Sequence, residues 1–389
     1  MNLITAFFFP ARLAWRQLLY DRTKLIAAIC GVLFATVLVF MQLGFKDALY
    51  AGATYAPAKM DGDLFLMHKQ TEAMWRSVLF ERSQLIRALG HPEVASAYPM
   101  YISEAQFKDT ETGTKRKLMV YGYDPDAYLF KIKEIRDQHE VLRQQDTILF
   151  DESCRPEFGP IRKFFSEGKV INEIDDHKVK MVGLFRLGIS FSADANVVTS
   201  DLNFSRIIPN RVPEMIDMGI IKLIPGANAD KVMSELISML NKDIKVFTSK
   251  QLIESEKLYW QIKTPIGFVF GFGTIMGLVV GLVIVYQILF TDISNHLNEF
   301  ATLKAMGYKN GYFVRVVFAS AFLLAILGFI PGFLMSLGLY HLTEEQIHMP
   351  MPLTIGKIFT IFLFILTMCV VAGMLAMRKL RAANPADMF

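Results

Sequence analysis

Long apolar runs lie near the two ends of the sequence, and a long stretch of mixed polarity separates them. A helix needs about 20 mostly apolar residues to cross a bilayer, which predicts four transmembrane helices. The first run is too long for a signal peptide and lacks a small-residue cleavage site, so we interpret it as a retained span. Apart from Arg315 at the border of the third, the predicted spans contain no Asp, Glu, Lys or Arg: residues 25–45, 264–291, 315–340 and 358–377.

The mixed stretch, residues 46–263, has the size of an ordinary soluble domain. Residues 71–90 place Met74, Val78 and Leu85 on one side of an amphipathic helix that ends at Gly90. Strand–helix–strand units therefore flank a strand-rich middle, which predicts an α+β domain. The second predicted helix is 230–240, and the predicted strands are 63–67, 95–107, 117–123, 147–150, 178–185, 219–224 and 244–248.

Basic residues beside the spans predict the orientation of the chain, because Lys and Arg are retained on the cytoplasmic side during insertion. The connection between the third and fourth spans, residues 341–357, instead carries Glu344 and Glu345, with Lys357 at its far end. We expect both termini in the cytoplasm of a bacterial inner membrane, an interfacial helix over 1–24, a cytoplasmic loop over 292–314, a tail over 378–389, and 46–263 outside. The basic groups are Arg12, Arg16, Arg22 and Lys24, then Lys304, Lys309 and Arg315, and finally Arg378, Lys379 and Arg381.

Composition fits this picture, with 53% apolar and only 20% charged residues among 389. The net charge of +4 does not indicate nucleic-acid binding, because the basic residues cluster beside the apolar runs. Of three cysteines, only Cys154 lies in the mixed stretch, so no disulfide framework forms there and we interpret this thiol as structural.

The sequence also lacks the groups that would drive transport or catalysis within this chain. Coupling to an ion gradient needs ionisable side chains inside the spans, and a nucleotide site needs a G-x-x-x-x-G-K-[ST] loop; neither occurs. We predict no catalytic residues and no bound cofactor or metal, and interpret Asp175-Asp176-His177 as a polar turn between strands. Work done by this protein therefore needs an outside source of energy.

Small residues mark places where the spans pack closely. Gly273, Gly277 and Gly281 recur every four residues and predict a flat strip for helix packing, either within the subunit or across a homodimer. Pro331 and Gly332 in the third span predict a kink.

The loop between the second and third spans contains Glu299-Phe300-Ala301-Thr302-Leu303-Lys304-Ala305-Met306-Gly307. Spacing alone favours a passive helix lying along the membrane. The run resembles the E-[FY]-x-x-L-[KR]-A-[MI]-G signature of FtsX-like and MacB-like permeases, the type VII ABC proteins. This resemblance implies a coupling helix that contacts a separate ATPase. The residues expected to make that contact are Glu299, Phe300, Thr302, Leu303, Lys304, Met306, Gly307 and Tyr308.

Other motifs narrow the resemblance to the DevC-like permeases of DevBCA-type exporters. They include Leu13-Ala14-Trp15, 40–45, 155–160, Tyr259-Trp260, 264–268 and 284–289, and thus extend over nearly the whole chain. The resemblance implies a MacB-like porter lobe from 46–130 and 212–263, with a Sabre-like insert over 131–211. It also implies a homodimer, a DevA-like ABC ATPase that binds ATP and Mg, a DevB-like membrane fusion protein, a TolC-like outer-membrane channel and a lipid-like or glycolipid cargo.

Other functions remain open at this stage. An FtsX-like chain of the same architecture would regulate a periplasmic cell-wall hydrolase, and an adaptor partner would distinguish the exporter from this regulator. A membrane-bound enzyme would need a catalytic constellation in residues 46–263, and a sensor would more simply use two spans than four.

Overall fold

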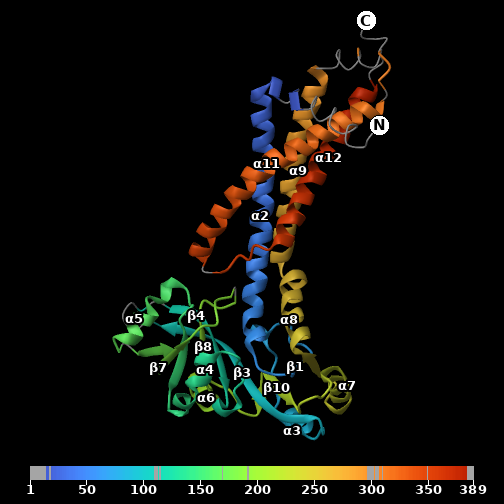
Figure 1. Cartoon of the computed structure of the whole chain (residues 1–389). Helices are drawn as coiled ribbons and strands as arrows, with labels where there is room; N and C mark the ends of the chain where they lie inside the picture. Colours follow the sequence, from blue (N-terminus) through green and yellow to red (C-terminus); the bar gives the residue numbers. More distant parts are fainter. Residues whose placement is uncertain are drawn as a thin grey trace. The chain divides into compact units, whose positions relative to one another are not determined.

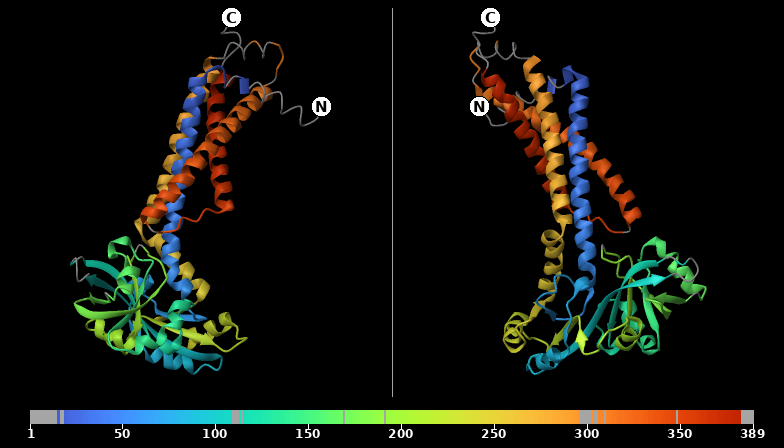
Figure 2. Two further views of the ribbon diagram at one scale, coloured as in Figure 1. Left: turned by 60° about the vertical axis from the view of Figure 1, so that its left-hand side comes forward. Right: turned by 180° about the vertical axis from the view of Figure 1, so that it is seen from behind.

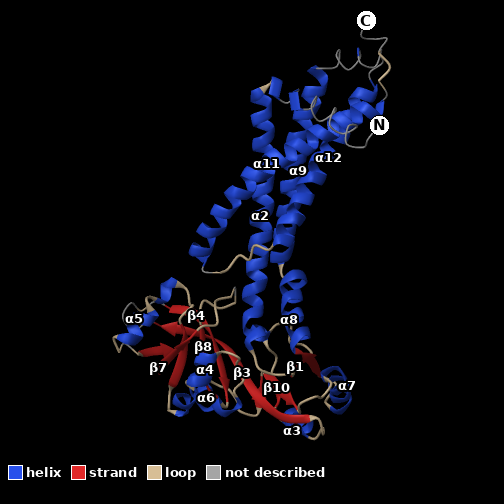
Figure 3. Cartoon of the chain, viewed as in Figure 1, coloured by secondary structure: helices blue, strands red, loops and turns tan. Residues whose placement is uncertain are grey.

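The computed structural model describes residues 15–16, 19–108, 113, 115–168, 170–190, 192–295, 302, 306–308, 310–347 and 349–382. The chain divides into two compact units. We call residues 1–47, 267–345 and 351–389 the helical unit, and residues 48–266 with 346–350 the β-rich unit. Figure 3 shows that the strands of the described chain belong to the β-rich unit.

Four helices among the described residues are long and apolar enough to cross a membrane, judged by length and composition (Figure 1). The β-rich unit is inserted between the first and second, which confirms the expected fold class. The helices are longer than the apolar runs because a helix need not be apolar once it leaves the bilayer. Their bounds are α2 (Arg22–Lys59), α9 (Pro265–Asn295), α11 (Asn310–Ile347) and α12 (Ile355–Ala382).

Aromatic and polar contacts join α2, α11 and α12 within the helical unit. Phe40 of α2 is fully buried and packs on the rings of Phe329 and Phe333, with centroids 5.9 and 5.6 Å away. The Tyr340 hydroxyl donates a 2.6 Å hydrogen bond to the Phe40 carbonyl oxygen. Lys357 lies over the Tyr340 ring at 5.8 Å, and its Nζ is 2.6 Å from Asp47 Oδ2. The one basic residue near the loop between the last two spans is thus paired.

Nine strands of the β-rich unit form one mixed sheet in the order β11-β1-β10-β3-β4-β8-β5-β7-β6. Strand β6 also pairs with β3, through Phe107↔Ile174 and Lys108↔Glu173, so six strands close into a ring. The sheet is strongly curved in both views of Figure 2. The strands are β1 (Leu64–His68), β3 (Val94–Lys108), β4 (Lys115–Tyr123), β5 (Thr147–Asp151), β6 (Ile171–Ile174), β7 (His177–Phe185), β8 (Asn196–Ser200), β10 (Met218–Leu223) and β11 (Ile244–Thr248).

Both faces of this sheet are covered. Along β1, Leu64 and Leu66 belong to one hydrophobic cluster, whereas Phe65 and Met67 belong to the other. Successive side chains of a strand point to opposite faces, so this alternation means that neither face of β1 meets solvent. The helices of the unit are α3 (Ser83–Leu89), α4 (Lys133–Asp137), α5 (Ile161–Ser166), α6 (Asp201–Ile207), α7 (Ala229–Met239) and α8 (Ser249–Leu258).

The helix predicted over 71–90 is wrong for most of its length. The segment forms a short 3-10 turn, η1 (Met74–Arg76), then β2 (Phe80–Glu81), and becomes helical only in α3. Strand β2 pairs with β9 (Met215–Ile216), far along the chain, and this pairing overrides the local periodicity. The other predicted elements of the mixed stretch agree with the structure within two residues at each end.

The two ends of the β-rich unit connect differently to the spans. Helix α2 continues without interruption from residue 22 to residue 59. Helix α8 instead passes into a π-helical turn, η5 (Tyr259–Lys263), and Thr264 is extended, with φ −110° and ψ 150°. Pro265 then begins α9, so the chain has a non-helical joint just before the second span. Turns of π-helix often mark functional positions.

Candidate functional site

The predicted coupling segment is partly described. Glu299, Phe300, Leu303 and Lys304 lie outside the described residues. Among the described ones, Met306 and Tyr308 are 64% and 43% exposed, and Thr302 is exposed as well.

One hydrogen bond and one glycine with positive φ mark the described part of this loop. The Met306 N–H donates a 3.0 Å hydrogen bond to the Thr302 carbonyl oxygen, which is the spacing of one helical turn. Gly307 follows with φ +93°, a conformation that favours glycine and ends the turn. The Tyr308 ring then lies 4.8 Å from that of Tyr312 in α11. Met306 and Tyr308 thus expose apolar surface in the described part of this loop.

The glycine strip of α9 lies against α2 and α12 of the same chain. A Cβ added at Gly277 would be 2.5 Å from Leu38 Cδ2, and one at Gly273 would be 2.5 Å from Gln42 Nε2. At Gly281 it would be 2.5 Å from Met368 Sδ and 2.6 Å from Ala35 Cβ. The three glycines therefore let helix backbones approach closely within the subunit.

Pro331 and Gly332 lie inside α11, which runs through them as one helix. A Cβ at Gly332 would be 2.8 Å from Thr36 Cβ of α2, so this glycine also permits a close helix contact. The kink expected at Pro331 stays a prediction.

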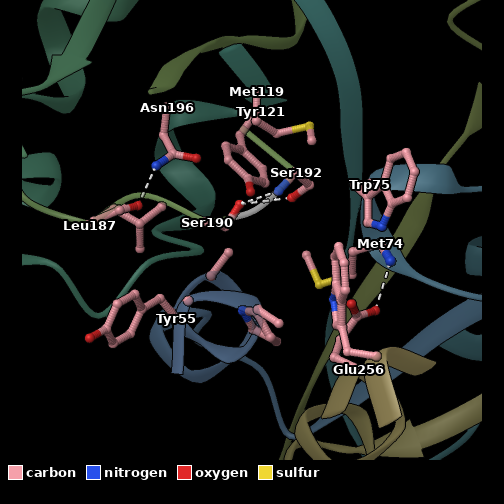
Figure 4. Close-up of a pocket in the computed structure, with 16 residues that line it drawn as sticks. Tyr55, Met74, Trp75, Met119, Tyr121, Leu187, Ser190, Ser192, Asn196 and Glu256 are labelled. Atoms are coloured by element: carbon pink, nitrogen blue, oxygen red, sulfur yellow. Dashed lines mark hydrogen bonds between the residues drawn. The ribbon is translucent and has the colours of Figure 1, made fainter. Parts of the chain in front are cut away.

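A partly enclosed pocket in the β-rich unit was not predicted. Figure 4 shows Met74, Trp75 and Glu256 toward one side of it, and Leu187 and Asn196 toward the other. The cavity measures about 30 Å³, room for one or two water-sized groups. We call it the Glu256 pocket. Its lining includes Gly52, Tyr55 and Pro57 of α2, Met119 and Tyr121 of β4, Ser190, Ser192, and Trp260 of η5.

Glu256 is the chemically unusual member of this pocket. Its side chain is only 4% exposed, and Oε1 accepts a 2.7 Å hydrogen bond from the Met74 N–H. Burial raises the pKa of Glu256 to about 7, while this hydrogen bond and the charge of Lys245 partly offset the rise. Trp75 Nε1 is buried and has no hydrogen-bond partner in the part of the chain that the structure describes. Because burial between η1 and α8 sets the pKa of Glu256, this pKa changes with any movement of η1 or α8 that alters the burial.

The opposite wall is held by a second buried carboxylate. Asp151 accepts hydrogen bonds from Asn196 Nδ2 at 2.9 Å and from the backbone of Leu187 and Gly188 at 3.2 and 3.0 Å. Burial raises the pKa of Asp151, although these hydrogen bonds favour its ionised form. Asp151 thus fixes the loop after β7 that faces α2.

The sequence carried a signal for Glu256 that our reasoning missed. Leu252, Glu256 and Trp260 stand four residues apart, which puts a carboxylate on the apolar face of an amphipathic helix. No local pattern shows that Met74 or Tyr121 lies beside it.

The segment Asp175-Asp176-His177 contains residue types that can bind metals, and it lies where β6 meets β7. Asp175 and Asp176 have φ of 46° and 63° and form the two-residue turn between β6 and β7, whose register pairs Ile174 with His177. His177 Nε2 lies 3.0 Å from Asp146 Oδ1. The prediction of a turn is confirmed. Within the described ranges, no group of three His, Cys, Asp or Glu side chains is placed to hold a metal ion.

Comparison with known proteins assigns the C-terminal part of the chain. Residues 271–385 match the family described as FtsX-like permease C-terminal. The match covers most of α9 and all of α11 and α12, so this part of the chain is similar to an FtsX-like permease domain. A search of curated proteins finds no match.

Three solved structures illustrate what the fold of about half of this chain is similar to. The periplasmic region of MacB from Actinobacillus actinomycetemcomitans has 11% identity and a TM-score of 0.36, over 51% of this chain and 94% of that one. The extracellular domain of the noncanonic ABC-type transporter YknZ from Gram-positive bacteria has 11% identity and a TM-score of 0.33, over 48% and 99%. A domain of a permease protein from Porphyromonas gingivalis has 12% identity and a TM-score of 0.30, over 48% and 86%.

Proposed function

We propose that this chain is the permease subunit of a tripartite ABC exporter of the DevC-like type. In this proposal a separate DevA-like ATPase moves the loop around Thr302–Tyr308, and the β-rich unit outside the membrane expels a lipid-like cargo. A DevB-like membrane fusion protein and a TolC-like channel complete the path. The observation that carries the proposal is the FtsX-like permease domain over residues 271–385, which contains the expected coupling segment.

The exposed side chains of the coupling segment support a contact with another protein. Met306 is 64% exposed although it is apolar, and Gly307 beside it has φ +93°. An ATPase surface that covered Met306 and Tyr308 would remove both from water and gain hydrophobic stabilisation. Glu299 and Lys304 would then make the charged contacts of the same interface.

The exposed face of α9 supports a homodimer. Val269, Phe272, Met276, Val279 and Val283 are 42–57% exposed and follow one another at spacings of three and four residues. Side chains on such a face of a membrane span meet lipid unless another helix covers them, and this spacing allows a second copy of α9 to pack there. The glycine strip occupies the other side of α9, against α2, so the same helix has one face for its own subunit and one for a second copy.

Charge reversal in the coupling segment tests the proposal. The chain is purified in mild detergent with the ATPase that accompanies it, and ATP hydrolysis is measured with and without the permease in nanodiscs. Glu299→Lys with Lys304→Glu should abolish the stimulation of hydrolysis, whereas Glu345→Lys, a matched change at the end of α11, should leave it unchanged.

Unchanged stimulation in the reversed variant would contradict the proposal. The copurifying partner decides between the two functions that share this architecture: a membrane fusion protein supports export, and a cell-wall hydrolase alone supports a regulator.

A further inference from the structure

One short segment of the β-rich unit, residues 71–77, contacts the joint between α8 and α9. We call it the clamp segment. It follows β1 and contains η1. Thr71 Oγ1 accepts a 2.9 Å hydrogen bond from the Val78 N–H, which closes the segment into a compact loop. The contacts of the clamp segment described below join residues of the β-rich unit.

On one side, the clamp segment holds α8 and η5. Glu256 of α8 accepts the hydrogen bond from the Met74 N–H at 2.7 Å, and both residues are buried. The Trp75 ring lies 6.5 Å from that of Trp260, nearly stacked at 26°, and 6.4 Å from that of Tyr259 at 72°. These contacts bind the last turn of α8 and the first turn of η5 to two residues of η1, Met74 and Trp75.

On its other side, the clamp segment is tied to the sheet. The Ser77 hydroxyl donates a hydrogen bond to Asp217 Oδ1. Asp217, only 1% exposed, directly precedes β10, and its Oδ2 accepts from the Ile102 N–H of β3 at 2.9 Å and pairs with Arg211. The Asp217 side chain therefore links the clamp segment to two central strands, β3 and β10.

Movement of α9 reaches the clamp segment through the chain at Thr264, because the contacts above hold η5 and α8 and not α9. The Thr264 hydroxyl donates a 2.8 Å hydrogen bond to the Trp260 carbonyl oxygen, which ties this joint to η5. Thr264 is extended and interrupts the helix between η5 and α9. At its other end α8 continues directly from β11, the edge strand of the sheet, and begins with the capping box of Thr248 and Gln251. Helix α8 itself packs on the sheet, because fully buried Leu252 belongs to the same hydrophobic cluster as side chains of β1, β3 and β10. The clamp segment adds a second buried link, from the joint to β3 and β10.

We propose that the clamp segment is the coupling element through which displacement of α9 reaches the nine-stranded sheet, with Glu256 and Trp75 as its positioning residues. The proposal rests on the ATP-driven function above and adds the route by which the motion travels. It requires that η1 stays bound to α8 and η5 while the membrane helices change position, so that β3 and β10 move with them. Loss of the Glu256 or Trp75 contact should uncouple the sheet without stopping ATP hydrolysis.

Hydrogen exchange of the full complex tests this route without knowledge of the cargo. The chain with its copurifying ATPase is compared in nanodiscs without nucleotide and trapped with ATP and vanadate, and exchange is followed in peptides from α9 and from β3 and β10. In the native protein we expect nucleotide-dependent changes in both regions. Glu256→Leu should reduce the change in the sheet at least about fivefold and preserve that in α9.

Matched variants separate coupling from folding. Glu256→Gln keeps an oxygen that accepts the Met74 N–H and should preserve the change in the sheet. Trp75→Ala should abolish it, and Glu254→Leu, at an exposed position of the same helix, should have no effect. Exchange without nucleotide shows whether each variant keeps the native sheet.

Each outcome bears on one proposal. The role of the clamp segment is overturned if the sheet responds to nucleotide equally in Glu256→Leu, Trp75→Ala and the native protein. It is also overturned if α9 of the native protein responds to nucleotide and the sheet does not. A native chain in which neither region responds contradicts the ATP-driven function itself.

Discussion

Replacement of Gly281 by alanine tests how closely the membrane helices pack. The added Cβ would lie 2.6 Å from Ala35 Cβ, and the short alanine side chain cannot rotate away. It would also lie 2.5 Å from Met368 Sδ, which can move because methionine is flexible. Overpacking of this kind costs about 1–3 kcal/mol. Alanine regains up to about 1 kcal/mol of helix propensity relative to glycine, so a net loss of about 1–2 kcal/mol is expected.

Two other glycines of α9 provide an internal scale. At Gly277 the one close contact of the added Cβ within the described residues is with Leu38 Cδ2, the end of a flexible side chain, so Gly277→Ala should cost less than Gly281→Ala. No described atom lies within 4 Å of a Cβ at Gly271, so Gly271→Ala should be neutral or stabilising.

Thermal unfolding of the purified chain in one detergent, followed by the fraction that stays monodisperse, measures this order. The expected order of midpoints is Gly271→Ala above Gly277→Ala above Gly281→Ala. If Gly281→Ala unfolded at the same temperature as Gly271→Ala, the close contact of α9 with α2 would be refuted.

Three further predictions follow from contacts elsewhere in the chain. The pKa of Glu256 is raised from 4.5 to about 7, so the contribution of this residue to the free energy of unfolding is greatest below pH 4.5 and falls by about 3 kcal/mol as pH rises to 7. In denaturation experiments, the stability of Glu256→Gln should therefore rise by this much relative to the native chain between pH 4.5 and 8. A stability difference that stayed constant with pH would contradict this prediction. The Lys357–Asp47 pair, with Lys357 only 9% exposed, should show a coupling of about 1–2 kcal/mol in a double-mutant cycle with Lys357→Met and Asp47→Asn, and a coupling near zero would show that the pair is solvated. In a cysteine-free background, Val279→Cys should form disulfide dimers in the membrane, whereas Thr274→Cys on the packed face should not; equal cross-linking would refute the α9 dimer face.

The spans and most strands could be predicted because their signals are local. Charge-free runs of sufficient length identify α2, α9, α11 and α12, and alternation identified β7 and β11 nearly to the residue. The extension of α2 to Lys59 was missed because Lys46 and Asp47 end the apolar run, although a helix can continue through charged residues outside a bilayer.

Features formed by distant residues could not be predicted. The ring depends on Phe107 pairing with Ile174, and nothing in either strand specifies the other. The Glu256 pocket likewise combines residues of α2, η1, β4 and α8. The periodicity of 71–90 gave a wrong helix because the pairing of β2 with β9, invisible in the local sequence, determines that segment. The coupling segment was identified by resemblance to a family and not by its pattern.

The ring of six strands has a consequence for how this protein is made. Strands β4 and β8, and β5 and β7, are parallel neighbours, which must wait for the intervening chain to cross over before they can align. The β3–β6 pairing that completes the ring joins residues more than sixty positions apart, and such distant contacts form slowly. Until then β3 and β6 present unpaired edges to other newly synthesised chains. We expect this protein to be most prone to aggregate during its synthesis, when many unfolded copies are present. This tendency should end when β3 and β6 pair.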